Sequence, residues 1–198
     1  YNRWRYDMLA EKHRCAWGQT SNDLMREYHD EEWGRPSHDS RHLFELLSLE
    51  IMQAGLSWQT VLNKRAAFKQ AFANFDYRQV QQMAPKIPVL LENTQIIRNR
   101  LKVMAIINNA RVIAQLAAKG EDFDHYVWAF VNNQPIRHHI TSHDQVPNTT
   151  DLAKHMSKQM KADGFAFTGP VVIYSFMQAA GLVNDHEADC FVNQILDE

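Results

Sequence analysis

The sequence predicts an all-α protein. Apolar residues recur at helical spacing through most of the chain, and few stretches show the alternation of a half-buried strand. Side chains that cap helices precede these segments, and glycine follows several of them. With 198 residues, 45% of them hydrophobic, the chain can bury a substantial core without cross-links, as one domain or as two fused lobes.

The first helices have clear boundaries. Ser37 or Asp39 can cap a helix that stops at Gly55, because an acceptor side chain satisfies free amides at the start and glycine ends the last turn. Ser57 can cap the next helix, which we expect to reach about Ala73.

The later helices follow the same rules. They are expected to begin at Asp76, at about Lys86, after the turn Asn93–Gln95, at Asp122 or Asp124, at Thr149 or Thr150, and at Pro170. The long helix after the polar turn should end at Gly120, the one after Thr149 or Thr150 at Gly164, and the last, apolar one at about Leu182. Only 134–148 is expected to be a long loop.

The net charge of -2 argues against a general polyanion binder, but the charges are distributed unevenly. No acidic residue occurs between Glu92 and Glu121. The basic residues of that window are Arg98, Arg100, Lys102, Arg111 and Lys119. This asymmetry indicates a surface that meets phosphates, although an ordinary solvated helix face would show the same pattern.

Two cysteines are too few for a disulfide framework. The sequence has no apolar run of about 18 residues, and its start has no apolar stretch of the kind that a secretory signal needs. We therefore expect a cytoplasmic protein with no membrane partner, in which thiolates are available to a metal ion.

Each cysteine has a histidine nearby in the sequence. Cys15 precedes His29, and His186 precedes Cys190 by four residues, so one helical turn or a tight loop can aim the second pair at a single ion. If the four meet, they form a tetrahedral site for a soft metal ion. The alternative is two buried free thiols and two core histidines, which stays open because a paired CxxC signature is missing.

A carboxylate interrupts the apolar side of the helix after Asp39. At 100° per residue, Glu50 falls on the same arc as three leucines, where an unpaired charge is very unfavourable. Aromatic residues occur nearby in the sequence or in the N-terminal segment; they are Trp17, Tyr28, Trp33 and Trp58. Such a cluster would bind a flat ring that is cationic or carries an amino group. The alternative is that Glu50 caps a neighbouring helix or forms a salt bridge with it.

Residues 91–102 can form a helix, a tight polar turn and a basic helix. The turn amides around Gln95 can seat a phosphate, and Arg98, Arg100 and Lys102 supply the attraction expected for a duplex backbone. Any two-helix corner beside arginines would look similar. Together with the carboxylate and aromatic cluster, the hairpin suggests a protein that holds DNA with one element and a flipped base with another.

Several segments resemble the DNA-3-methyladenine glycosylase I family. The segments are Arg14–Trp17, Tyr28–Gly34, Leu49–Trp58, Tyr174–Ala179 and Gly181–His186. The resemblance implies a helix–hairpin–helix DNA glycosylase fold with two helical lobes, both chain ends in one of them and a base pocket between. The expected lobes are 14–40 with 135–198, which would bind zinc, and 41–134, which would hold the hairpin. Residues 1–13 would be an N-terminal extension with a loose structure.

The family resemblance also implies roles for individual residues. Cys15, His29, His186 and Cys190 would hold one structural zinc ion, since four protein ligands leave no position for an activated water. Glu50 would be the catalytic, base-recognising carboxylate, with Tyr28 and Trp58 stacking on the base and Trp17 walling the pocket. The Gly55–Leu56 turn would approach the gap in the duplex. The chain departs from the family pattern at Gln95, where glycine is common, and at Met25, which is tyrosine in some members.

The implied reaction is hydrolysis of the N-glycosidic bond of N3-methyladenine in duplex DNA, which releases free 3-methyladenine and leaves an abasic site. We expect an enzyme without lyase activity, because Asn93–Gly120 contains no acid that could serve as the catalytic aspartate of many relatives. We also expect a monomer. Three alternatives remain: a noncatalytic module that binds DNA or a modified nucleotide, a hydrolase with a catalytic zinc ion, and a glycosylase with a different lesion range.

Overall fold

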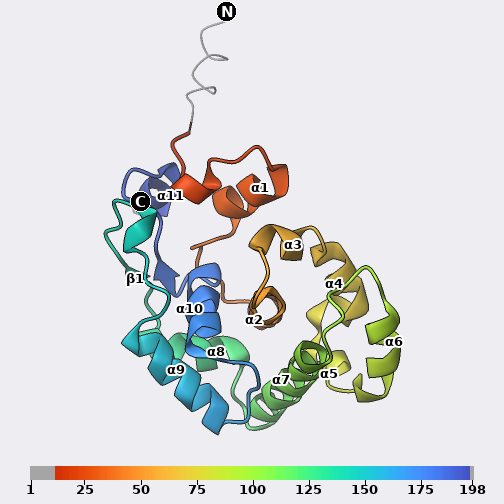
Figure 1. Cartoon of the computed structure of the whole chain (residues 1–198). Coiled ribbons are helices and arrows are strands. Elements are labelled where there is room, and N and C mark those ends of the chain that lie inside the picture. The colour runs from red at the N-terminus through yellow and green to blue at the C-terminus, as the bar shows by residue number, and fades with distance from the viewer. Residues whose placement is uncertain (1–11, 197–198) are drawn as a thin grey trace, which may run out of the picture.

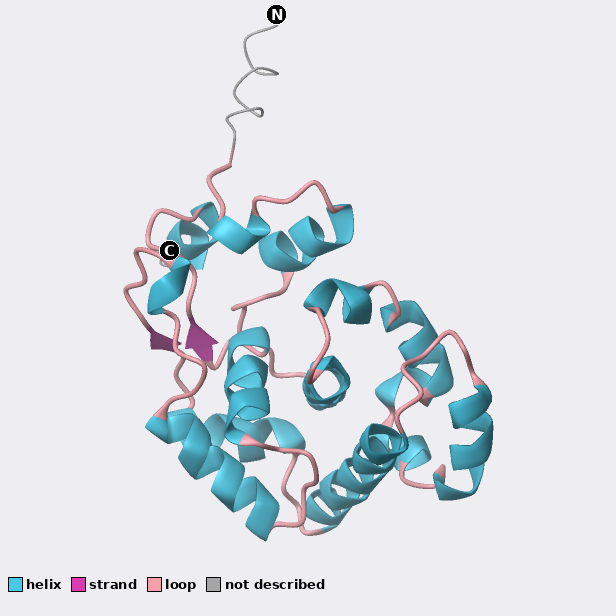
Figure 2. Ribbon diagram, viewed as in Figure 1, coloured by secondary structure: helices cyan, strands magenta, loops and turns pink. Residues whose placement is uncertain are grey.

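Helices make up most of the structure, a computed structural model that describes residues 12–196 (Figure 2). In chain order they are α1 (Asp23–Glu31), α2 (Ser40–Gln53), α3 (Trp58–Leu62), α4 (Arg65–Ala71), α5 (Tyr77–Val80), α6 (Ile87–Glu92), α7 (Arg100–Ala118), α8 (Phe123–Trp128), α9 (Asp151–Ala162), α10 (Pro170–Ala179) and α11 (Phe191–Leu196). The expected all-α class is confirmed. Within the described residues, no helix combines the length and apolar character that a membrane crossing needs.

Helix α2 lies at the centre of the molecule (Figure 1). It contacts α3, α7, α8 and α10, and every residue from Leu43 to Met52 is buried. The helices α3 to α7 lie on one side of α2 in the view, and α8 to α10 on the other. One hydrophobic core includes residues from both groups, so α2 positions the side chains that it carries with little freedom.

The capping residues predicted from the sequence are at the helix ends. The side chain of Asp39 accepts hydrogen bonds from the amides of Arg41 and His42 and so caps α2. Ser57 caps α3, Asp76 caps α5 and Thr150 caps α9 in the same way. These local hydrogen bonds satisfy amides that have no partner inside the helix.

The prediction of one helix from Ser57 to about Ala73 is wrong. The chain forms α3 and α4 with a break at Asn63 and Lys64, and Ala73 begins a turn with left-handed backbone angles. The redirected segment buries Phe68, Phe72 and Phe75 completely or nearly so. Tertiary burial of these rings therefore overrides the local helical pattern.

The predicted loop 134–148 contains structure that the sequence pattern did not reveal. Its β1 (Ile136–Arg137) pairs in parallel with β2 (Val183–Asn184), with Ile136 opposite Val183. A further bridge joins Ile140 to Glu187. The strands are too short to give a periodic signal, and their pairing joins segments that are distant in the sequence. They anchor the loop that carries His186.

The two ends of the described chain lie side by side (Figure 1). The amide of Phe191 donates to the carbonyl of His13 at 2.9 Å, and the Lys12 ammonium lies 4.5 Å from the centre of the Phe191 ring. Residues 1–11, most of the predicted extension 1–13, lie outside the described residues, as do 197–198. The division into lobes at residues 41 and 134 stays a prediction.

Candidate functional site: a base-sized cavity beside a metal-binding cluster

A cavity of about 390 Å³ opens between α1, α2, α3 and α10. The sequence-predicted residues Trp17, Tyr28, Glu50 and Trp58 all line it. The other lining residues are Met25, Trp33, Gln53, His143, Val146, Pro147, Asn148, Val171, Tyr174, Ser175 and Gln178. The fold therefore brings together four side chains that are up to 41 residues apart in the sequence.

Glu50 is the buried acid of this cavity. It lies in the last turn of α2, is only 5% exposed and has no hydrogen-bond or ion-pair partner among residues 12–196. Burial raises the pKa of the Glu50 carboxyl to about 8, because desolvation disfavours the charged form. The alternative in which Glu50 caps or pairs with a neighbouring helix does not fit this arrangement.

Two aromatic rings stand beside this carboxyl. The ring centres of Tyr28 and Trp58 are 5.0 Å apart and tilted by 48°, and Trp17 lies 6.4 Å from Tyr28. The Tyr28 hydroxyl and the Trp58 indole nitrogen are buried and meet no hydrogen-bond partner in the described part of the chain. Buried polar groups are normally paired, so these atoms are suited to a polar ligand in the cavity.

The part of the cavity wall that α10 contributes was missed by reasoning from the sequence. Val171, Tyr174, Ser175 and Gln178 reach it from α10, and His143 reaches it from the loop 134–148. The polar residues in the otherwise apolar segment of α10, spaced three or four apart, were the only signal. That signal does not say which other helix they face, because this contact is fixed by tertiary packing.

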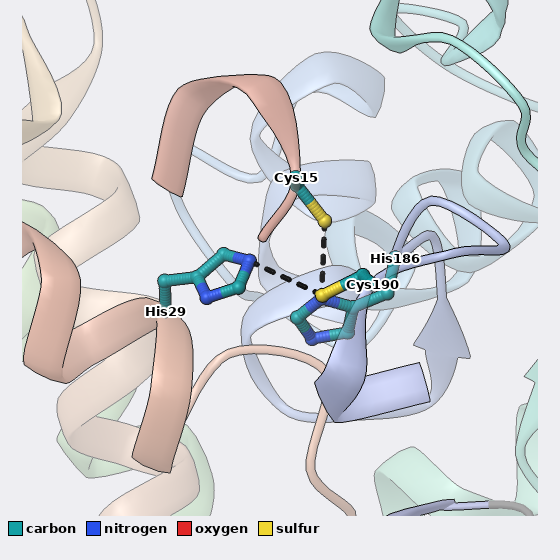
Figure 3. A group of neighbouring side chains, drawn as sticks. All are labelled: Cys15, His29, His186 and Cys190. Atoms are coloured by element: carbon teal, nitrogen blue, oxygen red, sulfur yellow. Dashed lines mark hydrogen bonds between the residues drawn. The ribbon is translucent and has the colours of Figure 1, made fainter. Parts of the chain in front are cut away.

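The four predicted metal ligands converge in the structure (Figure 3). Their ligand atoms all lie within 4.8 Å of one another, and all four residues are buried. The Cys15 sulfur is 3.2 Å from Nδ1 of His186, and the Cys190 sulfur is 3.7 Å from Nε2 of His29. His186 and Cys190 lie in a tight loop, one of the two arrangements that their spacing allowed.

The surroundings of the two histidines fit metal coordination. Nδ1 of His29 faces the Asp30 carboxylate at 2.9 Å, and Nε2 of His186 faces the Trp33 carbonyl at 2.9 Å. Each of these contacts fixes a proton on one ring nitrogen and leaves the other, which faces the sulfurs, as a ligand. Two sulfurs and two imidazole nitrogens are a donor set that zinc favours.

Close packing holds these rings in place. A Cβ atom at Gly18 would lie 2.5 Å from the His29 ring, so no other residue fits there without a shift. Arg14 donates to both oxygens of Asp30, at 2.8 Å and 3.1 Å from Nε and 2.8 Å from Nη2, and thereby supports the partner of His29. Neither feature could be predicted from the sequence, because each depends on a contact that exists only in the folded protein.

The hairpin between α6 and α7 is formed as expected, with a longer turn. Helix α7 begins at Arg100, and Asn99 caps it, whereas the sequence predicted a helix directly after Gln95. Gln95 is exposed and has no positive φ, so glycine is not required at this position. Arg98 and Arg100 are exposed on the same segment, where they can meet a phosphate.

Lys102 differs from these two arginines. It is 5% exposed, and its ammonium donates to the carbonyls of Met52 at 2.9 Å and Ala54 at 2.6 Å. Burial lowers the pKa of Lys102. The expectation of a surface lysine for phosphate is therefore not met, because this side chain binds the end of α2. Beyond that end, Gly55 has a φ of +80°, and Leu56 is 42% exposed.

Comparisons with known proteins agree with this geometry. A family model described as Methyladenine glycosylase matches residues 17–193. DNA-3-methyladenine glycosylase 1 of Escherichia coli strain K12 is 45% identical over 153 residues, which cover 77% of this chain and 82% of that protein. The chain belongs to the methyladenine glycosylase family. The resemblance seen in the sequence is thus confirmed.

Solved structures place this methyladenine glycosylase in the same fold. A crystal structure of 3-methyladenine DNA glycosylase I is 46% identical, with a TM-score of 0.87 over 90% of this chain and 98% of that chain. A variant of 3-methyladenine DNA glycosylase I, in complex with 3-methyladenine, is 38% identical with a TM-score of 0.86. It covers 90% of this chain and 96% of that chain. The expected helix–hairpin–helix glycosylase fold is confirmed, and the chain is an enzyme that hydrolyses N-glycosyl bonds.

Proposed function

We propose that this glycosylase extrudes N3-methyladenine from duplex DNA and hydrolyses its N-glycosidic bond. The products are free 3-methyladenine and an abasic site. The observation that carries the proposal is the unpaired, buried carboxyl of Glu50 in a cavity with aromatic walls. A solved relative binds 3-methyladenine, which is consistent with a purine ligand for this cavity.

Glu50 is proposed as the catalytic residue that reads the base. Methylation at N3 gives the base a positive charge, so it is already a good leaving group and needs less assistance than adenine. With a pKa of about 8, the carboxyl is mostly protonated at neutral pH in the empty cavity, and a cationic base would favour its ionised form. Glu50 would then accept a hydrogen bond from the exocyclic amino group of the base and stabilise its charge.

The aromatic residues are proposed to select the extruded base by stacking. Tyr28 and Trp58 would contact its faces, and Trp17 would close the pocket behind them. Stacking of this kind contributes about 1–3 kcal/mol per base, and flipping a base out of the duplex costs a few kcal/mol. Normal adenine lacks the positive charge and keeps a stable glycosidic bond, so it would leave the pocket unchanged.

The DNA would be held by the hairpin and the turn after α2. Gln95 would offer turn amides to a phosphate, and Arg98 and Arg100 would add sequence-independent attraction. Leu56, on the exposed turn after Gly55, would enter the gap that the extruded base leaves. Water is proposed as the nucleophile of a monofunctional reaction. Lys102, the only lysine in 93–118, has its ammonium bound to two carbonyls and is unsuited to attack on the sugar.

The metal cluster is proposed to hold one structural zinc ion. Cys15, His29, His186 and Cys190 would fill its tetrahedral shell, and the ion would supply cross-linking and no bound water for catalysis. A hydrolase with a catalytic zinc ion is disfavoured, because it would need an open coordination position. A monomeric state and a cytoplasmic location, expected from the sequence, stay predictions.

The experiment is to incubate the protein with methylated duplex DNA and identify the released bases. Release of 3-methyladenine without 7-methylguanine, with abasic sites but no strand cleavage, is the expected result. Glu50→Gln should keep the fold but weaken binding of free 3-methyladenine in an NMR titration, whereas Glu92→Gln, at an exposed position, should bind it normally. Absence of any base release would overturn the proposal and favour a noncatalytic DNA-binding module. Release of other bases would indicate a wider lesion range.

A further inference from the structure

Asp185 is a buried carboxylate that connects two residues of the cavity wall. It accepts a hydrogen bond from the Tyr174 hydroxyl at 2.5 Å and another from Nε2 of Gln178 at 2.7 Å. Nδ1 of His138 lies 2.6 Å from its other oxygen. Tyr174 and Gln178 are one turn apart on α10 and both line the cavity. Asp185 thus fixes two side chains that line the same cavity as Glu50.

The Asp185 contact determines which way the Gln178 carboxamide points. An ionised carboxylate can only accept hydrogen bonds, so the NH₂ group of Gln178 must face Asp185. Its carbonyl oxygen, Oε1, must then point away from Asp185. Within residues 12–196 no group donates a hydrogen bond to this oxygen. The buried side-chain atoms that lack a partner do not include it, so the oxygen is not fully buried. It is therefore available to a ligand in the cavity.

We propose that Gln178 is a specificity-determining residue for the base and that Asp185 is its positioning residue. Gln178 Oε1 accepts a hydrogen bond from the exocyclic amino group of the bound purine. This inference deepens the proposed function and rests on it, since it assumes that the cavity holds the alkylated base.

The chemistry of the amino group explains why a second acceptor is needed. The 6-amino group of adenine has two hydrogens that point to opposite edges of the ring. Glu50 can accept one of them, and the other would remain unpaired in a buried site, which is unfavourable. Gln178 reaches the cavity from α10, on a different wall from Glu50, and can accept the second hydrogen.

The same arrangement would reject a purine with a carbonyl group at position 6. Such a base presents its carbonyl oxygen to the carbonyl oxygen of Gln178, so this contact becomes repulsive. The Glu50 carboxyl can accommodate a 6-oxo group only in its protonated form, so Gln178 carries the discrimination. Discrimination by unpaired polar groups is stronger than discrimination by shape alone. Asp185 contributes by preventing rotation of the Gln178 carboxamide, which would otherwise offer its NH₂ group to a 6-oxo base.

The test compares Gln178→Met with a matched control. Gln159 donates to Asp163 at 3.0 Å, and Asp163 also accepts from the Tyr126 hydroxyl, so the same three residue types meet outside the cavity. Affinities for free 3-methyladenine and 3-methylguanine are measured by NMR titration. Gln178→Met should bind 3-methyladenine about tenfold more weakly and lose most of the discrimination between the two bases. Gln159→Met should match the wild type.

Asp185→Asn provides the second arm of the test. If Asp185 acts through Gln178, the substitution weakens 3-methyladenine binding in the wild type but adds no further loss in the Gln178→Met background. A purely structural role would lower affinity equally in both backgrounds and would overturn the assignment of Asp185. Zinc content and melting temperature are measured in parallel, because Asp185 precedes His186.

The outcomes separate this inference from the proposed function. Equal affinity of wild type and Gln178→Met for 3-methyladenine would overturn the role of Gln178 alone. A wild type that binds no 3-methyladenine would overturn the proposed function itself. Should Gln178→Met fail to fold, the labelled wild type still decides, because the carboxamide carbon shift of Gln178 must move on titration with 3-methyladenine. An unchanged shift contradicts the hydrogen bond.

Discussion

Glu50 lowers the stability of the protein that carries it. Its pKa in the folded state, about 8, lies above the ordinary value of 4.5. Below pH 4.5 the carboxyl is protonated in both the folded and the unfolded state, so its burial does not then lower the free energy of unfolding through ionisation. As the pH rises from 4.5 to 8, the unfolded state gains stability by ionising. At pH 8 the difference between the two pKa values lowers the free energy of unfolding by roughly 4 kcal/mol.

We therefore expect Glu50→Gln to be more stable than the wild type at pH 8 and similar to it at pH 4.5. Denaturant unfolding of both proteins at the two pH values measures the difference. Glu92→Gln, which changes an exposed carboxyl, should show no comparable pH-dependent gain. Equal stability of Glu50→Gln and the wild type at pH 8 would contradict the burial of an unpaired acid. A stability loss of this kind is common where a site is built for a ligand.

The cations around the hairpin should differ in their response to salt. Arg98 and Arg100 are exposed, whereas the Lys102 ammonium is bound to the carbonyls of Met52 and Ala54. The logarithm of the association constant for DNA falls linearly with the logarithm of the salt concentration. Replacing either arginine with alanine should make this slope less steep by about one. Lys102→Met should leave that slope unchanged and lower the melting temperature. A reduced slope for Lys102→Met would show that the lysine meets a phosphate.

At the level of elements, a partly buried ion-pair network joins α1, α2 and α4. Arg65 donates to both oxygens of Glu32, at 2.6 Å and 2.7 Å, and to Glu45 at 2.6 Å. His42 also contacts Glu32, at 2.9 Å. Although burial raises the pKa of Glu32, hydrogen bonds from His42 and Arg65 outweigh this effect and lower it to about 2. Glu32 follows α1 directly, so the network holds the helix that carries Tyr28.

Arg65→Met should destabilise the protein by about 3 kcal/mol at pH 7, because it leaves the buried carboxylate of Glu45 and the partly buried carboxylate of Glu32 without their shared partner. The stability that Glu32 contributes is present above about pH 4.5 and is lost as the pH falls toward 2. The stability difference between the wild type and Arg65→Met should therefore become smaller in acid. Unfolding at pH 7 and pH 3 measures this change. Arg111→Met, at an exposed position, serves as the control. A deficit independent of pH would indicate lost packing alone.

The helix boundaries that could be predicted are those set by local hydrogen bonds. Asp39, Ser57, Asp76 and Thr150 each cap a helix through their own backbone neighbourhood, which a sequence displays directly. The break between α3 and α4 depends instead on burial of aromatic rings in a distant core. The pairing of β1 with β2 likewise joins segments far apart in the chain. Such features require the tertiary fold.

For the whole molecule, the same distinction applies to the site. Glu50 was predictable because an acid on an apolar helix face is locally anomalous, and the four metal ligands were predictable as rare residue types. The α10 wall of the cavity and the inward turn of Lys102 were not predictable, since both depend on which helices meet. The large hydrophobic core around α2 fixes these contacts, and no local pattern encodes them.

The metal-binding cluster connects the chain ends to the cavity. The ring centre of Trp17 lies 4.9 Å from that of His29 and 6.4 Å from that of Tyr28. A metal ion that fixes His29 therefore also fixes one wall of the cavity. Elemental analysis should give about one zinc ion per chain, as four protein ligands imply. Cys15→Ser should lower the melting temperature by roughly 5–10 °C, because the metal contributes directly to folding.

Cys15→Ser should still release 3-methyladenine at temperatures well below its melting point, since no ligand position is left for a reacting water. A chelator should shift the wild type toward the melting temperature of Cys15→Ser and should have no effect on the variant. His139→Ser, an exposed histidine outside the cluster, should behave as the wild type. Loss of base release on chelation without a change in melting temperature would instead show that the ion takes part in the chemistry.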